Sequence, residues 1–261
     1  MRLNYHVYGV GKPIVLLHGW AMHSGIWGNF AQQLAQSHRV ICVDLPGHGQ
    51  SSALESFELA AISAALARTI ANEPACWLGW SLGATVALDF ASRYPERVSS
   101  LALLSGNPCF CLPPSASLTA VWPAMNSQVL QQFAEQLRNN AQATLLRFLA
   151  LQVLGSDHYK KVLAELKQAT TACPPPDAAT LAGGLAILKQ ADLRAALADL
   201  AIPVMAILGG RDTLVPVAVG EMMRQIQPLL QLQVLDKAAH APFLSHPEAV
   251  LALVSDFLVK A

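Results

Sequence analysis

Charged residues are scarce in this sequence of 261 amino acids. Asp, Glu, Lys and Arg together make up 13% of the chain, whereas about a quarter is usual for globular proteins. This composition excludes a disordered chain and a coiled coil. The 17 basic and 17 acidic residues cancel to a formal net charge of zero. A nucleic-acid-binding surface over the whole molecule is therefore not expected, and a charged partner would need a local patch.

Long apolar runs are also missing, although 53% of the residues are hydrophobic. A membrane-spanning helix needs about 20 mostly apolar residues, and charges or Pro/Gly turns interrupt every apolar stretch here. The N-terminal segment MRLNYHVYGVGKP lacks the apolar region of a signal peptide. Five cysteines, an odd number, show neither a disulfide-framework nor a zinc-site spacing. We therefore expect free thiols, no membrane contact and a cytoplasmic location.

Short apolar runs alternate with helical periodicity along most of the chain. Strands are predicted over residues 3–8, 13–17, 39–43, 75–78, 100–104, 204–208 and 230–235. Helices are predicted over residues 25–34, 57–70, 84–94, 217–226 and 247–259. This alternation is typical of an α/β fold with a mostly parallel sheet and helices on both faces. Between about 112 and 183 only helical periodicity remains, so we predict a discontinuous core, 1–111 and 184–261, with an inserted helical cap, 112–183.

The segment Gly79-Trp-Ser-Leu-Gly83 fits the pattern G-x-S-x-G and lies between a predicted strand and a predicted helix. In this context the pattern predicts a nucleophile elbow, a sharp turn that exposes the hydroxyl of Ser81. The two glycines allow close approach of the neighbouring backbone. A turn without a catalytic role is the structural alternative.

A serine hydroxyl needs a base, and the base needs an acid that orients it. In chains with this elbow the acid and then the histidine follow the serine. His240 lies in a small-residue loop after the predicted strand 230–235, and Asp212 follows the strand 204–208. We therefore predict Ser81, Asp212 and His240 as the catalytic residues. Asp236 is the rival acid, but it lies only four residues before His240.

A tetrahedral oxyanion needs two backbone N–H donors, which we expect from Leu82, the residue after the nucleophile, and from Trp20 in the loop after the first buried strand. Trp20 also has a simpler role available, as a packing residue. The sequence contains no G-x-x-x-x-G-K-[ST] pattern, no H-E-x-x-H pattern and no dinucleotide-binding fingerprint. It implies no metal and no organic cofactor.

The whole chain resembles the α/β-hydrolases and, more narrowly, the pimeloyl-acyl-carrier-protein methyl ester esterases of biotin synthesis. The resemblance rests on segments in both the core and the cap: Leu17-His-Gly-Trp20, Trp77-Leu-Gly-Trp-Ser-Leu-Gly83, Asn107-Pro-Cys-Phe110, Arg147-Phe-Leu-Ala-Leu-Gln152, Gly183-Gly-Leu185 with Ile187-Leu188, and Lys237-Ala-Ala-His-Ala-Pro-Phe243 followed by Ser245-His-Pro247.

That resemblance implies a serine carboxylesterase that removes the methyl ester from a substrate carried by acyl carrier protein and releases methanol. It also implies substrate contacts, which we expect from Trp20, Trp80, Ser81, Leu82, Phe148, Leu149, Ala150, Leu151, Gln152 and His240. The residues 148–152 also suit an amphipathic cap helix packed on the core. Both roles are compatible, since one face of a helix can line a tunnel.

Acyl carrier protein is acidic, so the resemblance also implies a basic docking patch. Residues 136–170 carry five basic and two acidic side chains, in a chain whose net charge is zero. The candidate docking residues are Arg138, Arg147, Lys160, Lys161 and Lys167. A solvated helix face would show the same composition.

Two other functions remain open from the sequence. A broad-specificity short-chain carboxylesterase, thioesterase or C–C hydrolase could use the same three residues. A non-catalytic ligand receptor could share the fold, but a receptor has no need to keep Ser81, Asp212 and His240 together. The relative rates on free esters and on the carrier-linked ester distinguish the enzymes, and a receptor would bind without turnover.

Overall fold

The computed structural model describes residues 3–112 and 122–260. Its centre is a seven-stranded sheet in the order β1-β3-β2-β4-β5-β6-β7. Only β1 is antiparallel to its neighbour, and the other pairs are parallel. The strands are β1 (Tyr5–Tyr8), β2 (Pro13–Leu17), β3 (Arg39–Val43), β4 (Ala75–Trp80), β5 (Val98–Leu104), β6 (Val204–Gly209) and β7 (Gln231–Leu235).

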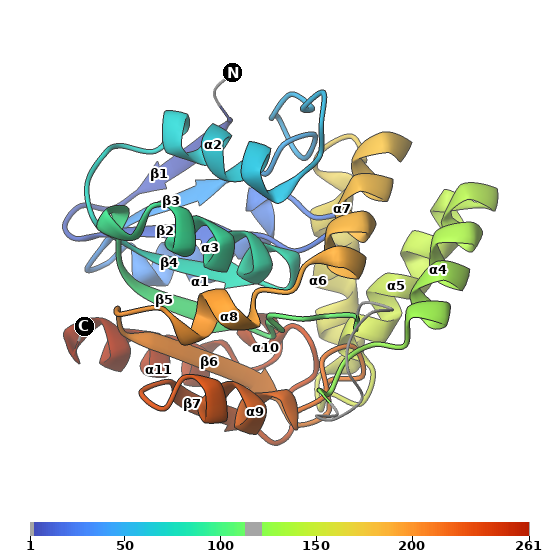
Figure 1. Cartoon of the computed structure of the whole chain (residues 1–261). Helices are drawn as coiled ribbons and strands as arrows, with labels where there is room; N and C mark the ends of the chain where they lie inside the picture. The colour runs from blue at the N-terminus through green and yellow to red at the C-terminus, as the bar shows by residue number, and fades with distance from the viewer. Residues whose placement is uncertain (1–2, 113–121, 261) are drawn as a thin grey trace.

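Helices cover both faces of the sheet because its inner strands are apolar on both sides (Figure 1). Successive residues of β2 alternate between two apolar clusters: Val15 and Leu17 enter one, Ile14 and Leu16 the other. The first cluster packs against α2 (Leu59–Thr69), α3 (Leu82–Arg93), α8 (Arg194–Ala198) and α9 (Val219–Ile226). The second packs against η1 (Ser24–Trp27), α1 (Gly28–Leu34), α10 (Pro242–Ser245) and α11 (Pro247–Lys260). A short 3-10 turn, η2 (Pro95–Arg97), precedes β5.

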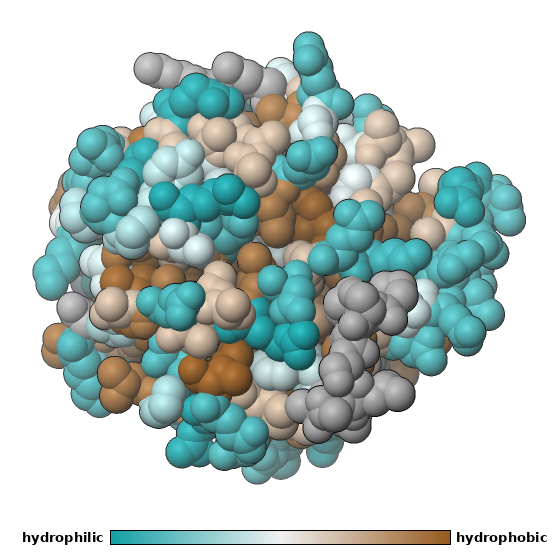
Figure 2. Space-filling model, in the orientation of Figure 1, coloured by the Kyte–Doolittle hydropathy of each residue, from teal (hydrophilic) through white to brown (hydrophobic). Residues whose placement is uncertain are grey.

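Four longer helices lie between β5 and β6 and form a separate layer beside the sheet (Figure 1). They are α4 (Ser127–Asn139), α5 (Ala141–Val153), α6 (Tyr159–Thr171) and α7 (Ala178–Gln190). We call α4–α7 the cap. The predicted cap boundary at residue 183 falls inside α7, so we move this boundary to the C-terminal end of that helix, Gln190. The division into core and cap stays a proposal. The outward surface of α4 is hydrophilic (Figure 2).

The α/β fold class predicted from the sequence is confirmed, and every predicted strand is present. The pattern missed α8 and α10, which have five and four residues, because a helix this short covers barely one turn of periodicity. No helix within the described ranges is both long and apolar enough to cross a membrane. All five cysteines are free, and four of them are buried.

Candidate active site

Ser81 lies on a strained turn between β4 and α3. Its backbone has φ +56° and ψ −118°, a region that non-glycine residues rarely occupy. The turn is that sharp because the helix packs directly onto the strand. A Cβ atom on Gly79 would overlap the backbone of Gly83, and one on Gly83 would overlap the carbonyl of Leu17. Both glycines of the pattern are therefore required by close backbone approach, and the elbow lifts the Ser81 hydroxyl out of the sheet edge.

The structure brings Ser81, His240 and Asp212 into one hydrogen-bonded chain. The Nε2 atom of His240 lies 2.9 Å from Ser81 Oγ, and its Nδ1 atom lies 2.7 Å from Asp212 Oδ2. Because a carboxylate only accepts, Nδ1 carries the imidazole hydrogen and Nε2 keeps its lone pair toward the serine. The side chains of His240 and Asp212 are 1% and 0% exposed. This geometry has the arrangement of nucleophile, general base and orienting acid.

Asp212 is held by its own loop as well as by the histidine. Its Oδ1 atom accepts backbone N–H bonds from Leu214 and Val215, at 2.8 and 2.9 Å. That leaves Oδ2 for His240. The rival Asp236 is exposed and directly follows β7. Asp212 thus lies just after β6, at the edge where parallel strands present their loops, and it stays the proposed orienting acid.

His240 is fixed through its backbone as well. Its carbonyl accepts a hydrogen bond from the indole Nε1 of Trp80 at 2.7 Å. Its N–H donates to the carbonyl of Gln152, in the cap helix α5, at 3.0 Å. Trp80 is fully buried and packs edge-to-face on Phe243. Trp80 therefore holds the backbone of His240 in place.

The loop after β2 places the backbone N–H of Trp20 near the elbow. Within the described residues neither this amide nor that of Leu82, the first residue of α3, donates a hydrogen bond. First-turn amides have no partner inside a helix, so both are available to an oxyanion. The indole of Trp20 donates to the carbonyl of Leu181 in the cap at 2.9 Å and is 2% exposed. Its side chain therefore packs, and its backbone remains the proposed donor.

Buried polar groups hold this loop from behind. The N–H of Leu45 donates to His18 Nε2 at 3.0 Å, so Nδ1 carries the hydrogen and donates to the carbonyl of Gly19 at 2.8 Å. Burial, with the neighbouring imidazole of His48, lowers the pKa of His18 to about 3. Burial also lowers the pKa of His48 to about 4. Both imidazoles are therefore neutral at pH 7 and hold the neighbouring backbone through hydrogen bonds.

A cavity of about 90 Å³ lies above Ser81 and His240 and is almost entirely apolar. Its wall combines core and cap side chains: Trp20, Phe110, Met125, Val129, Leu130, Phe133, Phe148, Leu151, Leu185, Leu188 and Leu214. Trp20 meets Phe133 and Phe148 edge-to-face, with ring centroids 5.6 and 5.0 Å apart. The cavity suits an uncharged acyl chain.

Only part of the predicted substrate-contact set reaches this cavity. The cavity is lined by Trp20, Ser81, Phe148, Leu151 and His240, but not by Trp80, Leu82, Leu149, Ala150 or Gln152. The reason is helical spacing. Positions 148 and 151 share one face of α5, while Leu149 and Gln152 are buried on another. Phe133 and Met125 also line the cavity but were not predicted, because nothing in the sequence distinguishes them from ordinary apolar packing residues before the helices are placed.

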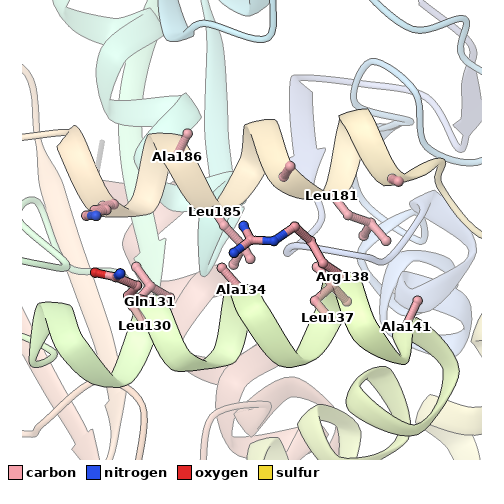
Figure 3. A pocket seen from close by; sticks show the side chains of 12 residues that line it. Leu130, Gln131, Ala134, Leu137, Arg138, Ala141, Leu181, Leu185 and Ala186 are labelled. Carbon is pink, nitrogen blue, oxygen red and sulfur yellow. The ribbon is translucent and has the colours of Figure 1, made fainter.

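The five basic cap residues do not form one cluster. Arg138 lines a groove of about 380 Å³ between α4 and α7, together with Lys189. Figure 3 shows the Arg138 side chain reaching from α4 across this groove toward α7. Lys161 lies 3.9 Å from Glu165 and lines a different cavity, beside η1 and α10. The remaining three, Arg147, Lys160 and Lys167, are exposed on α5 and α6.

No group of three or more His, Cys, Asp or Glu side chains suited to hold a metal ion occurs within residues 3–112 and 122–260. Ser81, His240 and the two backbone N–H groups form a nucleophile, a general base and candidate oxyanion donors. An arrangement of this kind performs acyl transfer from an ester or thioester to water.

Comparison with known proteins shows the family of the chain. The model of the alpha/beta hydrolase fold family matches residues 12–247. A protein of Methylococcus capsulatus (strain Bath) named pimeloyl-[acyl-carrier protein] methyl ester esterase is 39% identical over 261 residues, all of both chains. A protein of the same name from Edwardsiella ictaluri is 40% identical over 258 residues, covering 98% of this chain and 96% of its own.

Solved structures agree on the fold. An esterase from Exiguobacterium antarcticum superposes with a TM-score of 0.86 at 19% identity, covering 99% of this chain and 96% of its own. At that identity the likeness concerns the fold alone. The full-length sequence matches go further: the chain belongs to the α/β-hydrolases and, within them, to the carboxylic ester hydrolases of the pimeloyl-[acyl-carrier protein] methyl ester esterase family.

Proposed function

We propose that this chain hydrolyses the methyl ester of pimeloyl-acyl-carrier protein to the free carboxylate and methanol, as a cytoplasmic step of biotin synthesis. The observation that carries the proposal is the chain of hydrogen bonds from Ser81 Oγ through His240 to Asp212, 2.9 and 2.7 Å long, beneath an apolar cavity. Relatives that bear this activity in their names match 98–100% of the chain.

The first half-reaction transfers the acyl group to the enzyme. His240 Nε2 takes the proton of Ser81 as Oγ attacks the ester carbonyl carbon. The carbonyl oxygen becomes negative and accepts hydrogen bonds from the N–H groups of Trp20 and Leu82. Each such donor is typically worth about 10²–10³ in kcat. When the carbon–oxygen bond to the methoxy group breaks, His240 returns its proton to that group and methanol leaves.

The second half-reaction repeats the cycle with water. A water molecule gives a proton to His240 Nε2 and attacks the acyl carbonyl. The same two amides hold the oxyanion, and Ser81 leaves with the proton from His240. Asp212 keeps the imidazole in the tautomer that accepts at Nε2 and stabilises its charged form in both halves.

The substrate carries a thioester to the carrier at its other end, so the enzyme must admit only the distal ester. The catalytic cavity holds about 90 Å³, which is too little for the whole acyl chain with its carrier arm. The groove between α4 and α7 shares the walls Leu130 and Leu185 with this cavity. We place the exit of the chain there, where Arg138 and Lys189 would meet an acidic carrier.

Methanol release from purified protein and the carrier-linked methyl ester tests the proposal, with Ser81→Ala as the control. p-Nitrophenyl butyrate serves as a free short ester. Fast, Ser81-dependent methanol release from the carrier-linked ester supports the assignment. The small cavity also favours a second candidate, a general short-chain carboxylesterase. Turnover of p-nitrophenyl butyrate without methanol release would support that candidate and overturn the biotin-pathway assignment.

A further inference from the structure

The C-terminal end of α5 is bonded to both loops that carry the acid and the base. The last four carbonyls of a helix have no partner inside it. Here two of them accept from the catalytic loops: Gln152 from the N–H of His240 at 3.0 Å, and Leu151 from the hydroxyl of Thr213 at 3.4 Å. The cap helix that lines the cavity is therefore attached to the residues on either side of the Asp212–His240 bond.

The turn after α5 adds a second set of contacts. Arg211, directly before Asp212, donates from one guanidinium nitrogen to the carbonyl of Gly155 at 2.7 Å and to Asp157 Oδ1 at 2.8 Å. The other oxygen of Asp157 lies 3.7 Å from the ammonium of Lys237, three residues before His240. One cap carboxylate thus bridges the loop of the acid and the loop of the base.

These ion pairs contribute little to the free energy of folding. The side chains of Arg211, Asp157 and Lys237 are 44%, 38% and 68% exposed, and exposed ion pairs add little to folding. What the bridge does fix is relative position. A shift of one loop against the other would lengthen the 2.7 Å bond from His240 to Asp212, and errors of about 1 Å in a catalytic arrangement cost about 10²-fold in rate.

We infer that Asp157 and Arg211 are positioning residues that tie the cap to the catalytic loops and keep Asp212 and His240 aligned. The inference rests on the proposed esterase activity. Neither residue lines the cavity over Ser81. Loss of the bridge should therefore lower kcat and leave KM for a small ester unchanged.

The experiment measures kcat and KM for p-nitrophenyl butyrate with Asp157→Ala, Arg211→Met and the double variant. We expect kcat to fall about tenfold for Arg211→Met, which loses two acceptors, and about fivefold for Asp157→Ala. The double variant should be no slower than Arg211→Met, because the two residues act through one bridge. Asp157→Glu should restore most of the rate.

The matched control is Asp192→Asn, which weakens an ion pair of similar exposure with Arg194, just after the last cap helix. It should leave kcat unchanged. A melting temperature for each variant separates misfolding from misalignment, and the double-variant comparison stays informative if one single variant is destabilised. Unchanged kcat in both single variants, with an active wild type, would overturn the inference. An inactive wild type would instead refute the proposed function.

Discussion

The core and the cap, which form the two sides of the active site, differ in the kinds of side chain that they bury. Within the described residues, every buried ionisable side chain lies in the core, including His18, Asp44, His48 and His240. The buried polar side chains of the cap are uncharged: Thr144, Gln152, Ser156 and Thr180. The core side is thus fixed by directional bonds, whereas the cap side is shaped by apolar contacts.

This difference separates two tasks. Hydrogen bonds fix atoms to within a few tenths of an ångström, which the transfer of a proton between Ser81 and His240 requires. Apolar contacts are non-directional and tolerate substitution when volume is kept. We therefore expect the core to determine the reaction and the apolar side chains of the cap to select the acyl chain. Substitutions in the core should act on kcat, and those of apolar cap residues on KM or acyl length. The polar bridge through Asp157 is the exception, because it holds the catalytic loops and should act on kcat.

The largest effect is expected from Asp212→Asn. Because Leu214 and Val215 donate to Oδ1, the amide oxygen should stay there and the NH₂ group should face His240 Nδ1. The imidazole hydrogen would then move to Nε2, which could no longer accept from Ser81. We expect kcat to fall about 10⁴-fold with little change in KM, measured with p-nitrophenyl butyrate.

Asp236→Asn is the control for that variant, since Asp236 is exposed and follows a neighbouring strand. It should change kcat less than about twofold. Equal losses in both variants would contradict the assignment of the orienting acid.

A charge change in the cap should affect the rate on the carrier-linked ester and not the rate on a small free ester. Arg138→Glu reverses a charge at the groove between α4 and α7 (Figure 3). We expect kcat/KM for the carrier-linked ester to fall about tenfold, because charges at an interface rim act mainly on association. The rate on p-nitrophenyl butyrate should not change. Arg68→Glu, on the exposed side of α2, is the matched control. Equal effects of Arg138→Glu on both esters would contradict docking at this groove.

The sequence predicted the core well because its signals are local. A buried parallel strand has a continuous apolar run, and the elbow needs glycines at two fixed positions, so Gly79, Ser81 and Gly83 are recognisable without coordinates. The order of serine, acid and histidine then limits the choice to a few residues. Asp212 and His240 followed from that order and from their positions after strands.

The cap could not be predicted to the same depth. Helical periodicity shows that α5 has an apolar face, but not whether that face packs on the core or lines a cavity. Leu149 and Gln152 turn inward, and Phe148 reaches the substrate cavity. Arg211 and Asp157 are 54 residues apart in the sequence, and no local pattern relates them. Contacts of this kind appear only when the helices are placed.

The buried imidazoles predict how stability depends on pH. Burial lowers the pKa of His18 to about 3 and that of His48 to about 4. Between the unfolded value of about 6.5 and these values, the unfolded chain binds more protons than the folded chain. The free energy of unfolding should therefore fall as the pH drops below about 6.5, by about 1.4 kcal/mol per pH unit for each imidazole. Urea unfolding from pH 7 to pH 5 measures this slope.

His48→Gln should make that slope shallower by the share of one imidazole. His6→Gln, at an exposed position on β1, is the control and should leave the slope unchanged. Because the cap buries no ionisable side chain within the described residues, cap variants should shift the stability curve without altering its slope. An unchanged slope in His48→Gln would show that the core does not hold this imidazole neutral.

The smallest effect is expected from Phe148→Ala, which tests the cap as the selector of acyl length. Phe148 lines both the catalytic cavity and a neighbouring cavity of about 490 Å³. Truncation should join the two. We expect KM for p-nitrophenyl butyrate to rise about fivefold, and the preferred acyl length to move from butyrate toward octanoate. The value of kcat should hold, because the loop that carries the Trp20 amide is fixed from behind by His18.

Kinetics over a series of p-nitrophenyl esters measure both changes. Leu163→Ala removes a half-buried apolar side chain from α6, outside the catalytic cavity, and should leave the acyl-length profile as it is. If Phe148→Ala lowers kcat and keeps the profile, the cap helix belongs to the same rigid unit as the core. The division between a core that fixes chemistry and a cap that selects length would then fail at the residue where the two sides meet.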